Sequence, residues 1–155
     1  MNLYVALKVV HVISSTILFG TGLGVAFFKW IVDRSGSVSA IRVVSERVVL
    51  ADWLFTTPAI VIQAVTGIAL ATIAGFPLLR GWLACAICLY LVAGACWLPV
   101  VWLQIRMRDL ARQSEREGVS LPVAYHRYAL RWFWLGVPAF LSLVVVFWLM
   151  VAKPF

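Results

Sequence analysis

Residues 7–24 read LKVVHVISSTILFGTGLG, and their composition is the first indication of how the chain folds. It is apolar apart from Lys8, His11 and a run of small residues, and the apolar character continues to residue 28. A helix needs about 20 apolar residues to cross the hydrocarbon core of a bilayer. We therefore expect residues 4–28 to span a membrane, which leaves the buried histidine to be explained.

Three further runs have the same length and character, at residues 53–75, 82–104 and 132–152. The chain of 155 residues is 64% hydrophobic and 12% charged, and its mean hydropathy is +1.01. A soluble domain of this size could not hide so much apolar surface from water. The sequence therefore predicts an all-α, polytopic membrane four-helix bundle that forms a single transmembrane domain, residues 1–155.

Basic residues are distributed unequally between the expected connections. Ten of the 13 lysines and arginines lie after the first span or after the third span, and three lie elsewhere. Basic loops stay in the cytoplasm, so we expect two cytoplasmic connections and both termini outside. The formal charge of +7 then reflects orientation and contact with membrane lipid, and no nucleic-acid partner is expected.

Both long connections show helical spacing of apolar residues. Residues 38–49 are predicted to form a short helix that lies on the cytoplasmic interface. The third helix is expected to continue out of the membrane until Gly118, which is a typical C-terminal cap. Asp52, at the start of the second span, is interpreted as structural and as a partner for Arg47 or Arg131.

His11 has two interpretations. It can be a neutral histidine that hydrogen-bonds a neighbouring helix, or it can be an axial ligand, because imidazole is a common ligand of haem and metals. Lys8 can be an interfacial anchor or a cation for an anionic group such as a propionate. Gln63 can bond another helix or a ligand such as a quinone carbonyl.

Two other residues are expected near the depth of His11. Tyr90 and Met150 could each supply a weaker second partner, and methionine suits a His/Met haem. The three cysteines, Cys85, Cys88 and Cys96, fall near one helical stripe and leave a soft Cu(I) site open. Motifs typical of hydrolases and phosphoryl-transfer enzymes are absent.

Several long motifs carry a family resemblance. LFGTGLGVAFF, ADWLFTTPAIVIQAVTGIAL, LYLVAGACWLPVVWLQIRMRDL and RWFWLGVPAFLSLVVVFWLMVAKPF resemble the bacterial membrane family known as domain of unknown function 2269. This resemblance implies a multi-pass protein of the bacterial inner (cytoplasmic) membrane. The family name carries no function.

A more distant resemblance does suggest one. The LKVVH opening, TPA followed by TGIAL, and the terminal VP and KPF are similar to HemJ-type protoporphyrinogen oxidases, which group with CopD-like membrane domains. The resemblance implies haem b, with His11 in the position of the family's opening histidine. Leu135 and Gly136 stand where that family has an Asn-Glu pair, so the residues implied to act on the porphyrinogen are missing.

These observations lead to three functional hypotheses. In the first, the bundle binds haem b or another porphyrin in an outer-leaflet pocket for redox or porphyrin handling; His11, Lys8, Tyr90 and Gln63 bind the cofactor, and His11 and Met150 bind the metal. In the second, the chain is a non-catalytic accessory, copper-handling or assembly subunit without haem. In the third, a G-x-x-x-G face at Gly20 and Gly24 joins homo-oligomers or a partner membrane subunit. Enzymatic activity is left open.

Overall fold

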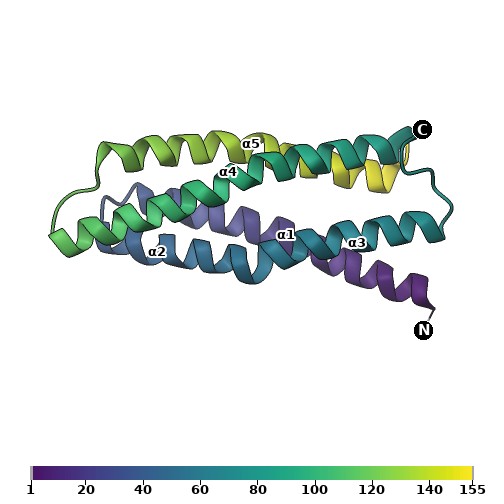
Figure 1. Ribbon diagram of the computed structural model, residues 1–155, viewed down its shortest axis with the longest axis horizontal. Coiled ribbons are helices and arrows are strands. Elements are labelled where there is room, and N and C mark those ends of the chain that lie inside the picture. The colour runs from purple at the N-terminus through teal and green to yellow at the C-terminus, as the bar shows by residue number, and fades with distance from the viewer. Residues whose placement is uncertain (1, 155) are drawn as a thin grey trace.

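The computed structural model describes residues 2–154 and is helical along almost all of that range (Figure 1). The elements in chain order are α1 (Leu3–Asp33), α2 (Val38–Ala51), the π-turn η1 (Asp52–Thr56), α3 (Thr57–Ile73), α4 (Gly81–Glu117) and α5 (Val123–Ala152). Since α2, η1 and α3 follow one another without a break, the chain forms four long helical rods.

All four rods are long and apolar enough to cross a membrane, which confirms the predicted all-α, four-span class. They contain 31, 36, 37 and 30 residues. At about 1.5 Å per residue these rods are about 45–55 Å long, whereas a hydrocarbon core is about 30 Å thick. Each rod is therefore longer than a single span requires.

The predicted interfacial helix at residues 38–49 was wrong in its placement. That segment is α2, which continues through η1 into α3 and packs upright against α4 and α1. Ile41 of α2 is buried in one cluster with Met107 and Ala111 of α4. An amphipathic helix can bury its apolar face in a membrane interface or in a neighbouring helix, and here α4 is long enough to provide that neighbour. The predicted C-terminal end of the third long helix is confirmed, because Gly118 caps α4 with φ of 66°.

The π-turn η1 has a local cause in the sequence. The N–H of Thr57 donates to the carbonyl of Asp52, five residues back, instead of four. Pro58 follows directly, and it has no N–H to donate to Leu54 while its ring crowds the carbonyl four residues before it. A wider turn relieves that crowding, and such turns often occur at functional sites.

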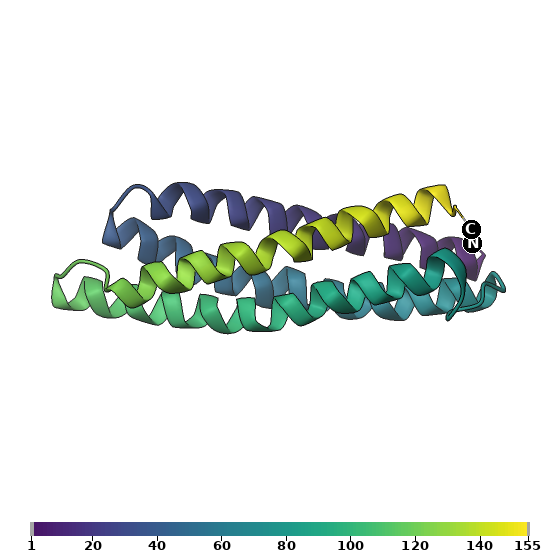
Figure 2. The same cartoon turned by 90° about the horizontal axis from the view of Figure 1, so that it is seen from above.

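Both termini lie at one end of the bundle (Figures 1 and 2). The connections at residues 34–37 and 118–122 lie at the other end, which we call the arginine-rich end after the basic residues of α2, α4 and α5 near it. This arrangement agrees with an even number of spans. The side of the membrane on which each end lies remains a prediction.

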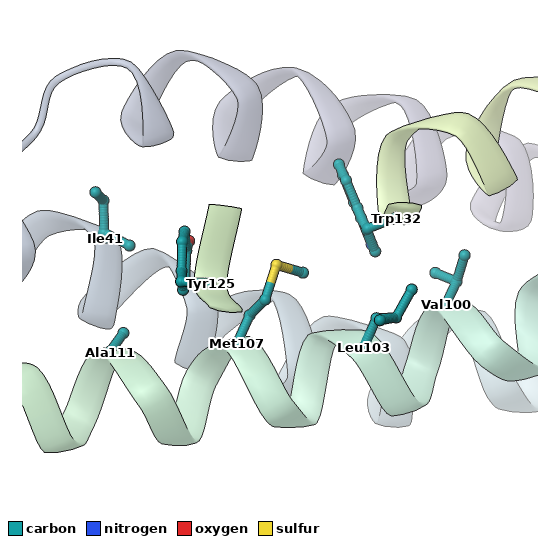
Figure 3. Packing of buried hydrophobic residues seen from close by; sticks show 7 residues of the cluster. All are labelled: Ile41, Val100, Leu103, Met107, Ala111, Tyr125 and Trp132. Atoms are coloured by element: carbon teal, nitrogen blue, oxygen red, sulfur yellow. The ribbon is translucent and has the colours of Figure 1, made fainter. Parts of the chain in front are cut away.

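The four rods form two helix pairs, in which α1 packs along α3 and α4 packs along α5. Packing between the pairs is concentrated in two clusters. The first lies toward the arginine-rich end (Figure 3) and the second toward the termini. Their buried members are Ile41, Val100, Leu103, Met107, Ala111, Tyr125 and Trp132 in the first, and Ala71, Trp82, Leu83, Ala86, Val146 and Leu149 in the second.

Ion pairs tie the arginine-rich end together. Glu46 of α2 accepts hydrogen bonds from Arg42, at 3.2 Å, and from Arg112 of α4, at 2.7 Å. Arg42 also pairs with Glu115 of α4. These contacts hold α2 against α4 at the arginine-rich end.

Candidate functional site

A cavity of about 350 Å³ lies between the two helix pairs and opens to the outer surface, where its lining residues Leu23, Phe133 and Leu141 are exposed. Side chains from α1, η1, α3, α4 and α5 form its walls, which are almost entirely apolar. Six of the lining residues are aromatic: Phe19, Tyr90, Trp97, Trp132, Phe133 and Phe140. Val100 and Trp132 also belong to the first core cluster, so one end of the cavity abuts that cluster.

Glycines help to keep this space open. Gly22, Gly94 and Gly136 line the cavity, one on each of α1, α4 and α5. A Cβ atom added at any of the three would meet no atom within 4 Å. The missing side chains therefore leave volume that the neighbouring residues do not fill.

Buried polar residues lie at the cavity end beside the first core cluster. Asp52, Thr56 and Gln104 all line the cavity and are only 6%, 4% and 4% exposed. The Thr56 hydroxyl donates to Asp52 Oδ1 at 2.8 Å. In residues 2–154, Asp52 Oδ2 and Gln104 Oε1 have no hydrogen-bond partner. Buried polar atoms are rarely left unpaired, because the lost hydrogen bonds to water are not replaced.

Two indole groups of the cavity wall share this property. Trp97 Nε1 and Trp132 Nε1 are buried and have no acceptor within the described part of the chain. The cavity wall thus holds two acceptors and two donors that lack hydrogen-bond partners. A largely apolar cavity with a few polar groups gathered at one place is the usual form of a small-molecule site.

Asp52 is the residue whose role the sequence analysis missed. Its expected pairing with Arg47 or Arg131 was wrong, since the salt bridges found across residues 2–154 do not include Asp52. It lies at the start of the π-turn, buried, with Thr56 as its hydrogen-bond partner. The available signal was an Asp with Thr four residues later and Pro six residues later, a combination favouring a side-chain bond within a distorted turn.

His11 lies in a separate polar cluster between α1 and α3, and it is absent from the cavity lining. Ser14 Oγ donates to Gln63 Oε1 at 2.5 Å, and the Gln63 amide lies 3.0 Å from His11 Nε2. His11 Nδ1 lies 2.8 Å from Thr66 Oγ1, whose hydroxyl donates to the carbonyl of Ile62.

With the Gln63 amide oriented as in the structure, these contacts assign the proton on the His11 ring. The Gln63 amide nitrogen can only donate, so His11 Nε2 accepts and His11 Nδ1 carries the proton that it donates to Thr66. His11 is therefore neutral with both ring nitrogens satisfied. Gly67 leaves room for the ring, because a Cβ atom there would lie 3.1 Å from His11 Cε1.

The other candidate residues have different surroundings. Gln63 meets His11 as described, whereas Tyr90 lines the cavity and donates its hydroxyl to the carbonyl of Ile60 at 2.7 Å. Lys8 is exposed, and Met150 is half-buried against the core cluster near the termini. Within residues 2–154, the structure brings Gln63 to His11 and shows no hydrogen bond from His11 to Lys8, Tyr90 or Met150.

As arranged, these residues do not fit a haem. The Nε2 atom that would bind iron already accepts from Gln63, and Nδ1 bonds Thr66. The cavity has no His11 in its wall, and none of its lining residues is a lysine or arginine that could pair with propionates. Haem binding at His11 would require the Gln63 amide to leave the imidazole, and it stays a prediction.

A preformed metal site is also lacking in the described part of the chain. No group of three or more His, Cys, Asp or Glu side chains there could hold a metal ion. Cys85 and Cys88 are exposed, Cys96 is half-buried, and all three are free thiols. Copper handling therefore has no ready-made ligand set in this arrangement.

A buried cation is a second feature that the sequence did not reveal. Lys29, expected in a cytoplasmic connection, is 1% exposed between α1 and α5. Its amine contacts Asp33 Oδ2 at 2.8 Å and the Tyr125 hydroxyl at 2.9 Å, and Tyr125 donates to Asp33 Oδ1 at 2.7 Å. The amine also lies over the Trp132 ring, 5.7 Å from its centroid. Lys29, Asp33 and Tyr125 are thus hydrogen-bonded to one another, and none of them lines the cavity.

The chain belongs to the family described as "Predicted integral membrane protein (DUF2269)", whose model matches residues 5–154. This confirms the family resemblance and a multi-pass integral membrane protein. No curated protein and no solved structure matches the chain. The resemblance to HemJ-type oxidases and CopD-like domains therefore stays a prediction, as does assignment to the bacterial inner membrane.

Proposed function

We propose that this membrane protein binds a lipophilic small molecule in the cavity between its two helix pairs. The observation that carries the proposal is a cavity of about 350 Å³ that combines apolar walls with unpaired buried polar atoms. Known ligand pockets span about 300–1,000 Å³ and have the same mixture of apolar walls and a few polar groups.

The polar atoms distinguish this cavity from a packing defect filled by lipid chains. An acyl chain would satisfy the apolar walls but would leave Asp52 Oδ2 and Gln104 Oε1 without partners. A molecule with both an apolar body and a polar group would satisfy both parts of the site. The π-turn supports this proposal, since it places Asp52 and Thr56 on the cavity wall.

Haem b or another porphyrin is the competing ligand. The neutral, fully bonded His11 and the lack of lysine or arginine among the cavity-lining residues argue against it. Reduced and oxidised absorption spectra of the purified protein test it directly. Sharp α and β bands that disappear in His11→Ala would replace the cavity proposal with a haem protein.

Native mass spectrometry of the protein purified in mild detergent tests the cavity proposal. We expect a retained small molecule that is released on unfolding. Gly94→Leu should abolish its retention, because the new side chain enters the cavity. Gly20→Leu is the matched control, since Gly20 is an exposed helical glycine with equally open surroundings and does not line the cavity.

The outcomes separate clearly. Loss of the molecule in Gly94→Leu together with retention in Gly20→Leu supports the proposal. Equal retention in both variants would place the molecule on the outer surface and would contradict it. A wild-type protein that carries no molecule, and that takes up none from a membrane lipid extract, would contradict it as well.

A further inference from the structure

We infer that the cavity selects lipophilic cations, with Asp52 as the group that recognises the positive charge. This inference rests on the proposed function, because it names the class of ligand for the same site. It follows from three features of the cavity: a buried carboxyl group with one free oxygen, an aromatic wall, and the absence of basic residues from the lining.

The carboxyl group is the first feature. Asp52 is 6% exposed; its Oδ1 atom accepts from the Thr56 hydroxyl, and the Gln104 side chain lies beside the same carboxyl group as a second, weaker partner. Asp52 Oδ2 has no hydrogen bond among residues 2–154, and Gln104 Oε1 beside the same cavity has none either. A buried carboxyl group without a compensating charge holds a proton, which it can donate to an acceptor such as Gln104 Oε1. A bound cation would take the place of that proton.

The aromatic wall is the second feature. Six aromatic side chains line the cavity, and they include Tyr90, Trp97 and Trp132. The face of an aromatic ring attracts cations because the ring quadrupole is negative there, and tryptophan does so most strongly. Lys29 already uses one face of Trp132 in this way, at 5.7 Å from the centroid. A delocalised organic cation can use the remaining faces without a tight hydration shell.

The third feature is the charge balance around the cavity. Asp52 is the only lining residue that is an acid, and no lysine, arginine or histidine lines the cavity. Lys29 lies outside the lining and is paired with Asp33 and Tyr125. A fatty acid, a phospholipid head group or a propionate would place a negative charge beside the Asp52 carboxyl group. The arrangement therefore favours a cation over an anion of the same shape.

Three probes of nearly identical shape test this selectivity: tetraphenylphosphonium, neutral tetraphenylsilane and anionic tetraphenylborate. Binding of each probe to the wild-type protein is measured by calorimetry in a separate titration in mild detergent, because the cation and the anion form a poorly soluble salt when mixed. We expect tetraphenylphosphonium to bind and tetraphenylborate to bind at least about tenfold more weakly. Asp52→Asn should weaken tetraphenylphosphonium binding at least about tenfold, because the shape is kept and the charge is lost.

Asp109→Asn is the control variant, since Asp109 is an exposed acid on α4 outside the cavity lining. It should leave binding unchanged. Selectivity among the three probes is measured on the wild-type protein alone, so the test stands even if Asp52→Asn does not fold. Equal binding of cation, neutral probe and anion would overturn the inference and leave the cavity proposal in place. Absence of binding by all three, combined with no retained molecule in mass spectrometry, would overturn both.

Discussion

At the scale of single residues, hydrogen bonds explain why a histidine can lie in an otherwise apolar span. The sequence alone predicted that His11 needs a partner, and it named hydrogen bonding to a neighbouring helix as one of two readings. It could not identify Gln63 and Thr66 as the partners, because that depends on the register of α1 against α3. Asp52 and Lys29 were missed for the same reason: their burial results from contacts between helices far apart in the sequence.

Gln63→Leu should lower the stability of the folded bundle by about 1 kcal/mol. The change leaves His11 Nε2 without its hydrogen-bond donor, whereas the Ser14 hydroxyl keeps the His11 carbonyl as an acceptor. Equilibrium unfolding in mixed detergent micelles measures the free energy. Gln113→Leu, at an exposed position on α4, is the control and should change it little. Equal effects in the two variants would show that the cluster around His11 does not stabilise the bundle.

Lys29→Met should be considerably more damaging, at about 3 kcal/mol. It removes a cation that is 1% exposed and leaves Asp33 without its charge partner. The same unfolding experiment measures the loss, with Lys8→Met as the comparison because Lys8 is exposed. A loss no greater than that of Lys8→Met would argue that the pair with Asp33 contributes nothing to stability.

At the scale of elements, hydropathy predicted the number and type of the long helices. It did not predict the placement of a helix whose apolar stripe fits two different surroundings. The apolar stripe of residues 38–49 suits an interface as well as a helix bundle, and only the length of α4 beside it decides between them. The π-turn also escaped prediction. Pro58 indicated a disturbed helix at this place, but hydropathy cannot show that the chain accommodates it with one widened turn.

Deleting Leu54, an exposed residue of the π-turn, should leave the fold intact. A π-turn amounts to one extra residue in an α-helix, so its removal restores regular geometry and keeps the registers of α2 and α3. The deletion also places Pro58 inside a regular helix, which costs about 3 kcal/mol. Thermal stability should therefore fall moderately with the fold retained, while ligand retention falls because Asp52 is re-aimed. Deleting Val61 in α3 is the control, since it turns Gln63 and Thr66 away from His11 and should destabilise the protein. Comparable damage from both deletions would contradict this account of η1.

At the scale of the whole molecule, two helix pairs are joined by packed clusters at both ends and separated between them by the cavity. The even number of rods and the common end for both termini followed from the count of apolar segments. The cavity could not be predicted in this way. It depends on where Gly22, Gly94 and Gly136 come together in space, although these glycines lie far apart in the sequence.

The orientation of the bundle is testable with C-terminal reporter fusions. Ten of the 13 basic residues lie in or near the two connections of the arginine-rich end, so we expect that end in the cytoplasm. Alkaline phosphatase fused after residue 155 should be active, and green fluorescent protein at the same place should be dark. The opposite pattern would invert the orientation without changing the helix arrangement.

Photolabelling can show whether a ligand binds in the cavity between the two helix pairs. A lipophilic cation that carries a diazirine is irradiated with the protein, with and without excess tetraphenylphosphonium, and the adducts are mapped by mass spectrometry. The account predicts competed adducts on residues that line the cavity, among them Phe19, Trp97 and Phe140. Adducts confined to outward-facing residues such as Val65, Leu91 and Val145, and insensitive to the competitor, would contradict it.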